Sequence, residues 1–187
     1  INSGLTINVN SLTINSGATL IDDSSTFQIY ATNVTNNGTL KTQGMDSALI
    51  RVWSTFDNNG IINSTAGQIN LEYGGTHSGQ FMGAAKILII GSDHFFLSSS
   101  YITVKKIDFI ATGELDIPGR FYQTQAGSYV SLENSHVNLT SLTSPVIGEV
   151  YLFSNASLTY GLSGTTSDSV VVPRYTTLSG TGTIAGD

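Results

Sequence analysis

The chain has 187 residues, of which 40% are hydrophobic and only 11% are charged, and its formal net charge is -6 at pH 7. The length allows one domain with a sizeable core, but the charged fraction is less than half of the roughly 25% that is usual in soluble domains. The seven basic residues are scattered, so nucleic acid is not an expected partner. No apolar run is long enough to span a membrane. The absence of cysteine excludes disulfides and thiolate metal sites.

Short runs that alternate apolar and polar residues begin near the N-terminus and recur along the chain. Leu5, Ile7 and Val9 alternate with polar residues, and after a polar corner the pattern resumes with Leu12 and Ile14. A period of two residues is typical of strands with one buried face. Two strands joined by a single polar corner predict a coil that bends without reversing. Later runs predict strands at 27–30, 49–53, 68–73, 101–104, 107–110, 129–132, 136–139, 150–153 and 169–172.

A turn built on Asn and Gly, followed by a short alternating run, recurs about every 21 residues in the first third of the chain. It occurs at 15–20, 36–40 and 58–62. This spacing is the length of one rung in a solenoid, whose stacked units share a continuous core. The spacing becomes uneven after about residue 75, which predicts protruding loops in the middle of the chain. The sequence therefore predicts an all-β solenoid.

Segments 11–17 and 177–184, with Leu158-Thr159, repeat the patterns Leu-Thr-Ile and Asn-x-Gly-x-Leu. In these patterns the chain resembles the right-handed parallel β-helix surface proteins, which include autotransporter passengers and filamentous-haemagglutinin-type adhesins. The resemblance implies a right-handed parallel β-helix and an elongated body that is extracellular or at the cell surface. It implies no named activity. We expect 1–187 to form a single β-solenoid segment that is an excerpt of a longer chain.

Candidate catalytic and metal-binding groups are few. Asp22-Asp23 is the only adjacent carboxylate pair, and its surroundings favour a solvated corner over a catalytic dyad or a calcium site. Asp93-His94 could join His77 and His136 in a metal site, but no two histidines have a short ligand spacing. A capping or loop histidine is therefore the expected role of His94. No catalytic, cofactor or metal site is predicted, and the chain is not expected to be an enzyme.

Aromatic residues and sequons give the candidate binding and modification sites. Strand aromatics are expected to stack in the core between rungs, although a sugar-stacking platform on one face is an alternative. The residues considered for such a platform are Trp53, Tyr73, Phe81, Tyr101, Phe121, Tyr122, Tyr129, Tyr151 and Tyr160. Among them only Phe121 and Tyr122 are predicted to be loop-borne and to contact a glycan. N-glycosylation sequons begin at Asn33, Asn37, Asn63, Asn138 and Asn155, several of them near predicted turns.

These features predict a non-catalytic extracellular solenoid that serves as a stalk, an adhesin, or a building block of a surface layer or filament. The expected partners are neighbouring domains or identical subunits that pair with the solenoid ends, together with surface glycans. The alternative is a carbohydrate-active β-helix that uses the looped region 74–125. It would be a polysaccharide-binding module, or a glycan lyase or hydrolase.

Overall fold

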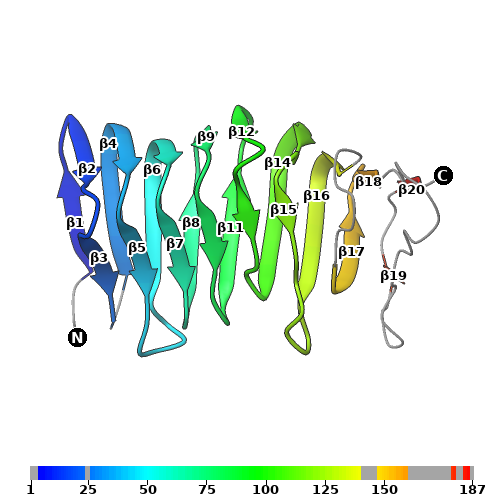
Figure 1. The fold of residues 1–187 in the computed structure, drawn as a ribbon, viewed down its shortest axis with the longest axis horizontal. Coiled ribbons are helices and arrows are strands. Elements are labelled where there is room, and N and C mark those ends of the chain that lie inside the picture. Colours follow the sequence, from blue (N-terminus) through cyan, green and yellow to red (C-terminus); the bar gives the residue numbers. More distant parts are fainter. Residues whose placement is uncertain (1–3, 24–25, 140–146, 160–177, 180–182, 186–187) are drawn as a thin grey trace.

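The computed structural model describes residues 4–23, 26–139, 147–159, 178–179 and 183–185. It is an all-β structure in which parallel strands stack into a β-solenoid of about 7 turns. The turns follow one another along a single axis, from the N-terminal end to the C-terminal end (Figure 1). This confirms the predicted parallel solenoid. In the part of the chain that the structure describes, no helix is long and apolar enough to cross a membrane.

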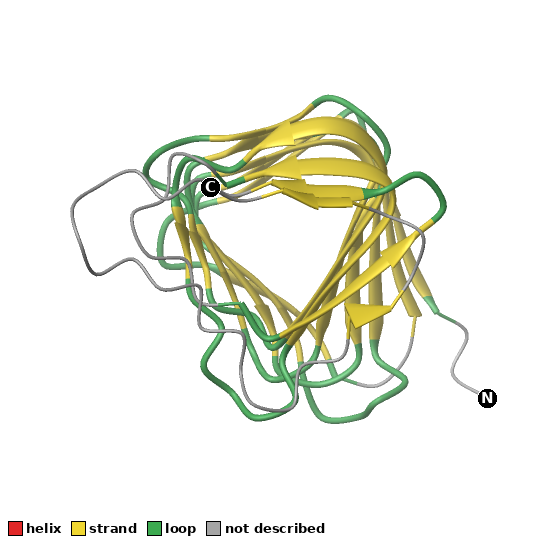
Figure 2. Ribbon diagram, turned by 90° about the vertical axis from the view of Figure 1, so that its right-hand side faces the viewer, coloured by secondary structure: helices red, strands yellow, loops and turns green. Residues whose placement is uncertain are grey.

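Seen along the axis, the described part of the solenoid has three sides (Figure 2). The first two faces belong to one 14-stranded sheet that bends at a corner, and the third face is a six-stranded sheet. Four strands continue around the bend and contribute to both of the first two faces: β4 (Thr26–Asn36), β6 (Leu49–Asn58), β14 (Lys106–Asp116) and β16 (Tyr129–Asn138). The register shifts between Tyr30 and Asn33, and again between Ile110 and Gly113, where the chain bends.

The remaining strands each lie on one face. The first face also contains β1 (Leu5–Asn8), β8 (Gln68–Leu71), β11 (Lys86–Ile90), β17 (Glu149–Phe153) and β19 (Leu178–Ser179). The second also contains β2 (Ser11–Ile14), β9 (Gly75–His77), β12 (His94–Phe96), β18 (Ser157–Thr159) and β20 (Thr183–Ala185). The third consists of β3 (Thr19–Asp22), β5 (Thr39–Thr42), β7 (Ile61–Ser64), β10 (Gln80–Met82), β13 (Tyr101–Ile102) and β15 (Arg120–Phe121).

The core is built from columns of inward-facing side chains that stay in register from turn to turn. One column on the first face contains Phe27, Ile50, Ile69, Ile87, Ile107, Val130 and Val150, all of them buried. Burying each such side chain stabilises the fold by roughly 1.5–3 kcal/mol. The alternation in the sequence therefore follows from the fold, because the apolar residue at every second strand position faces the shared core.

The Asn-Gly turns of the sequence repeat form the corner between the second and third faces. Gly38, Gly60 and Gly79 occupy equivalent places, and each lies against the backbone of the preceding turn. A Cβ atom at these positions would lie 2.3 Å from the Asn15 carbonyl oxygen, 2.2 Å from that of Gly38 and 2.1 Å from that of Gly60, respectively. Glycine is required here because the two backbones approach too closely for any side chain.

The same corner contains two fully buried asparagines, Asn36 and Asn58. The Asn36 side-chain amide donates to Asn58 Oδ1 at 2.8 Å and to the Ile61 carbonyl at 3.0 Å, and its own Oδ1 accepts from the Gly38 N–H at 3.2 Å. Asn58 in turn donates to the Gln80 carbonyl at 3.4 Å. The asparagines thus satisfy backbone groups that the turns leave unpaired inside the protein.

Replacing Asn36 with alanine should lower the free energy of unfolding by about 2 kcal/mol, since it leaves the Gly38 N–H and Asn58 Oδ1 buried without their partner. The matched control is Asn59→Ala at the exposed neighbouring position, where the amide bonds to Asn37 at 3.1 Å on the surface. That change should stay within about 0.5 kcal/mol of the parent. Urea unfolding followed by circular dichroism measures both variants, and equal effects would contradict the structural role of the buried amide.

The predicted strands that fall within the described residues are found, with one difference in their extent. The runs predicted at 129–132 and 136–139 belong to one strand, β16, because the chain bends at the corner without leaving the sheet. The expectation of a solvated corner at Asp22-Asp23 is wrong for Asp22, which ends β3 with a buried side chain. Its Oδ2 accepts the Leu49 N–H at 3.1 Å, so this carboxylate connects two turns. The strand predicted at 169–172 lies outside the described residues.

Candidate functional site

The structure separates the two aromatic residues that the sequence predicts as glycan contacts. Phe121 is not loop-borne but lies in β15, and its side chain is only 2% exposed because it faces the core. The prediction of glycan contact is therefore wrong for Phe121. Tyr122 follows the strand and points outward with 46% of its surface exposed. Side chains alternate between the two faces of a strand, so these two neighbouring aromatic residues point in opposite directions although the sequence alone does not distinguish them.

The five sequon asparagines differ in accessibility. Asn33, Asn37 and Asn155 are exposed, whereas Asn63 and Asn138 are half-buried. The Asn138 amide nitrogen, to which a glycan would be attached, donates to Asp116 Oδ1 at 2.7 Å. Asn63 has its side-chain oxygen buried without a hydrogen-bond partner. Three of the five positions therefore present an accessible asparagine.

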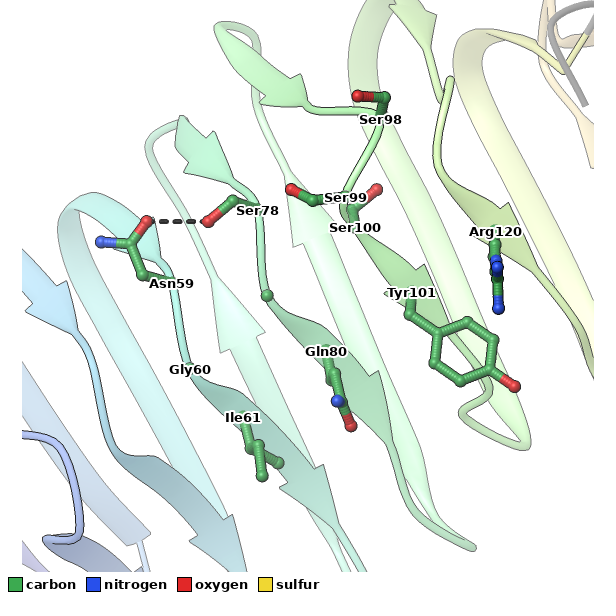
Figure 3. A pocket seen from close by; sticks show the side chains of 11 residues that line it. Asn59, Gly60, Ile61, Ser78, Gln80, Ser98, Ser99, Ser100, Tyr101 and Arg120 are labelled. Carbon is green, nitrogen blue, oxygen red and sulfur yellow. Dashed lines mark hydrogen bonds between the residues drawn. The ribbon is translucent and has the colours of Figure 1, made fainter.

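A polar hollow of about 490 Å³ lies at the corner between the second and third faces (Figure 3). We call it the serine groove. Its side chains come from successive turns of the solenoid, so the groove crosses several rungs. It is lined by Asn59, Gly60, Ile61, Ser78, Gly79, Gln80, Ser98, Ser99, Ser100, Tyr101 and Arg120.

The chemistry of the serine groove is that of hydroxyl and amide groups with one cation. The Ser78 hydroxyl donates to Asn59 Oδ1 at 2.9 Å, which continues the surface row of asparagine amides. Arg120 lies at the other end of the groove, next to Tyr101 (Figure 3). A guanidinium with neighbouring hydroxyls can bind a carboxylate or the hydroxyls of a sugar. The groove has the composition of a site for a polar or acidic glycan.

A second exterior feature is a row of three aromatic rings, Tyr30, Trp53 and Tyr73, which we call the aromatic ladder. Tyr30 and Trp53 are register partners on adjacent turns, and their rings are parallel within 2° with centroids 6.1 Å apart. The Tyr73 ring follows at 6.0 Å from Trp53, tilted by 49°. The rings lie on the outside of the solenoid, where the first face meets the second. The sequence predicted that aromatic rings of successive turns stack in the core. In the structure such stacking also occurs on the surface.

The groups around the aromatic ladder fix the orientation of its rings. The Tyr30 hydroxyl donates to Gln28 Oε1 at 2.7 Å, and the Arg51 guanidinium lies 5.9 Å from the centre of the Trp53 ring. An adjoining hollow of about 520 Å³ is lined by Asn8, Val9, Asn10, Tyr30, Ala31, Thr32 and Trp53. The hollow is thus lined by aromatic, amide and hydroxyl groups without an ionised side chain.

An ion pair on the first face joins two neighbouring turns. Lys86 Nζ lies 2.5 Å from Asp108 Oδ2. Burial raises the pKa of Asp108, although Lys86 opposes this shift. Burial disfavours the charge on Lys86, but the hydrogen bond and attraction to Asp108 prevail and raise its pKa. Because the Asp108 side chain is only 11% exposed, the pair is suited to holding turns together rather than to meeting a substrate.

The structure corrects the expectation of a lone capping or loop histidine at His94. His77 Nε2 and His94 Nδ1 lie 2.9 Å apart, and both side chains are buried between β9 and β12. The rings of Phe81 and Phe96 pack against His77 at 5.3 and 4.8 Å. Burial lowers the pKa of both histidines, that of His94 to about 4. Sequence spacing could not reveal this pair, since it depends on the register of β9 against β12.

The other described side chains considered for a metal or catalytic site do not come together in one place. Within the described ranges, no three His, Cys, Asp or Glu side chains come together in a way that could hold a metal ion. Asp93 is exposed and His136 is half-buried on β16, where its Nδ1 lies 2.7 Å from the Ser157 hydroxyl.

Sequence reasoning found part of these surfaces. It considered Trp53 and Tyr73 only for the alternative of a sugar-stacking platform. It missed Tyr30, although the alternation of apolar and polar residues in β4 could have placed this ring on the exterior of the solenoid. Comparisons of the chain with models of protein families, with curated proteins and with solved structures found no match. A proposal for function therefore rests on the solenoid and its exterior.

Proposed function

We propose that the chain is a non-catalytic, extracellular β-solenoid that serves as a structural and adhesive body at a cell surface. The observation that supports this proposal most directly is the stacking of about 7 turns on shared apolar columns. Backbone ladders run along the long axis, so a pulling force along the axis is resisted by many parallel hydrogen bonds. A rigid rod of this kind suits a stalk, an adhesin or a filament.

Three of the described carboxylates support the same proposal through the bonds they make. Asp22 accepts from Leu49, Asp57 accepts the Thr76 N–H at 2.8 Å, and Asp108 pairs with Lys86. Each of these bonds joins one turn to the next. The acidic groups thus contribute to cohesion along the rod, which is the property that a mechanical function requires.

The exterior supports a role outside the cell. Sequon asparagines at Asn33, Asn37 and Asn155 are exposed, so glycans at these positions would project without disturbing the core. The stack of parallel strands provides backbone groups with which neighbouring domains or identical subunits could pair at the solenoid ends. We therefore include glycosylation and end-to-end association in the proposal.

The second candidate, a carbohydrate-active solenoid, is favoured by the serine groove. Its hydroxyl and amide groups and Arg120 lie within the looped region 74–125 or directly beside it. A polysaccharide enzyme would require a carboxylate or another proton-transferring group at the bound glycan. The serine groove provides polar contacts, and this chemistry is sufficient for binding.

Incubation of the protein with a panel of insoluble and soluble polysaccharides distinguishes the two candidates. Retention on one or more insoluble glycans without release of oligosaccharides is the expected result. Released products would be measured as new reducing ends and by mass spectrometry. Time-dependent product release at a rate proportional to protein concentration would contradict the non-catalytic proposal. Retention on none of the glycans would contradict the adhesive part.

A further inference from the structure

The aromatic ladder offers ring surface that the core does not use. Tyr30 is 39% exposed and Tyr73 is 59% exposed, although both are large side chains that a structural role alone would place inside. With Trp53 between them, they occupy three consecutive turns at one corner of the solenoid. Aromatic residues held rigidly at a surface are typical of sites that bind a partner.

The polar side chains that line the hollow beside the rings are uncharged. Asn8 and Asn10 line the hollow next to Tyr30, and the Thr32 hydroxyl donates to Asn10 Oδ1 at 3.3 Å. Amides and hydroxyls both donate and accept hydrogen bonds, as the hydroxyls of a sugar also do. The nearby guanidinium of Arg51 is directed at the Trp53 ring. This lining matches a ligand that is polar but carries no charge.

The spacing of the aromatic ladder follows from the fold. Adjacent strands of a sheet lie about 4.8 Å apart, and the ring centroids of the ladder are 6.1 and 6.0 Å apart. One sugar of an extended β-1,4-linked chain has a similar length. With its hydroxyls equatorial, such a sugar presents an apolar C–H face to an aromatic ring and hydroxyls to the side. Successive sugars can therefore meet successive turns.

We propose that the aromatic ladder binds an uncharged, β-1,4-linked polysaccharide chain that lies along the solenoid axis. Its sugar rings pack against Tyr30, Trp53 and Tyr73, and its hydroxyls bond to Asn8, Asn10 and Thr32. This assigns a ligand class to the adhesive function proposed above and rests on that function. The serine groove lies at a different corner and takes no part.

The single tryptophan of the chain makes the site directly observable. Because Trp53 is in the middle of the aromatic ladder, addition of cellohexaose should change the intrinsic tryptophan fluorescence in a saturable manner. The indole N–H is covered and has no partner, so the change should arise from contact with the ring. A hexamer of galacturonate, which is charged, should produce no saturable change. Absence of a change with cellohexaose, xylohexaose and mannohexaose alike would overturn the proposal.

Substitutions locate the binding surface. Tyr73→Ala and Tyr30→Ala keep the fluorescent reporter and should each weaken cellohexaose binding at least about tenfold, as truncation of central aromatic contacts does. Phe153→Ala is the matched control, since it removes an exposed aromatic side chain at the end of β17, four strands beyond β8 in the same sheet. It should leave the affinity unchanged. Circular dichroism verifies that each variant is folded, and Tyr73 is the safest position because it is the most exposed of the three.

Retention of Trp53→Ala on insoluble cellulose separates this proposal from the adhesive function. Loss of retention in the folded variant is the expected result. Retention of Trp53→Ala equal to that of the parent would overturn the aromatic ladder as the site and leave the adhesive function standing. If the parent binds no glycan of the panel, both proposals are contradicted.

Discussion

Replacing Gly60 with alanine should lower the free energy of unfolding by about 3 kcal/mol, at the upper end of what overpacking usually costs. The added Cβ would lie 2.2 Å from the Gly38 carbonyl oxygen and 2.9 Å from the Gly38 nitrogen. Both atoms belong to the backbone of the preceding turn, so neither can rotate away. The two turns would have to separate, and the inward columns beside them would lose contact. Urea unfolding followed by circular dichroism measures the loss.

Gly17→Ala provides the control for this prediction. Gly17 has a φ of +79°, but a Cβ there would meet nothing within 4 Å. Its replacement should therefore cost about 1–2 kcal/mol from backbone conformation alone. A Gly60 variant that is no less stable than the Gly17 variant would show that the turns do not stack as closely as the structure has them.

Lowering the pH from about 6.5 to about 4 should destabilise the protein through the His77–His94 pair. An unfolded histidine has a pKa of about 6.5, whereas burial lowers the pKa of folded His94 to about 4 and also lowers that of His77. Below pH 6.5 the unfolded state thus binds more protons than the folded state, and stability falls as the pH falls. Since one pKa unit corresponds to about 1.4 kcal/mol, His94 alone accounts for about 3 kcal/mol.

The geometry explains why a second proton is not accepted. The contact between His77 Nε2 and His94 Nδ1 requires one nitrogen to donate and the other to accept. When both rings are protonated, both nitrogens donate and the hydrogen bond is lost in a buried site. A charge on His77 would also lie among the rings of Phe81 and Phe96. The pair is therefore stable only when at least one ring is neutral.

The variant His77→Leu should reduce the slope of unfolding free energy against pH in the window from 6.5 to 4. Phe81→Leu is the matched control, because it removes a ring that packs edge-on against His77 without removing a titrating group. It should lower stability at every pH and keep the slope. Urea unfolding at a series of pH values measures both variants. An unchanged slope in His77→Leu would contradict the assignment of acid sensitivity to this pair.

Local patterns in the sequence were enough to predict the strands and the class of fold. Alternation at Leu5, Ile7, Leu12 and Ile14 predicted strands, since a residue every second position must face the core. The Asn-Gly repeat predicted stacked turns of about 21 residues, because a turn that recurs at this spacing beside short strands is typical of a solenoid. Both predictions depend on neighbours along the chain, and a sequence displays these directly.

Which residues from different turns lie side by side could be seen only in the folded chain. Folding brought Tyr30, Trp53 and Tyr73 together outside the solenoid and placed Phe121 inside, although all four are aromatic residues in or beside strands. It also paired His77 with His94 and connected Asp22 to Leu49. These contacts depend on the register between turns, and a shift of one residue would move every side chain to the opposite face. Register is set by the whole stack of turns, so the candidate binding surface could be located only in three dimensions.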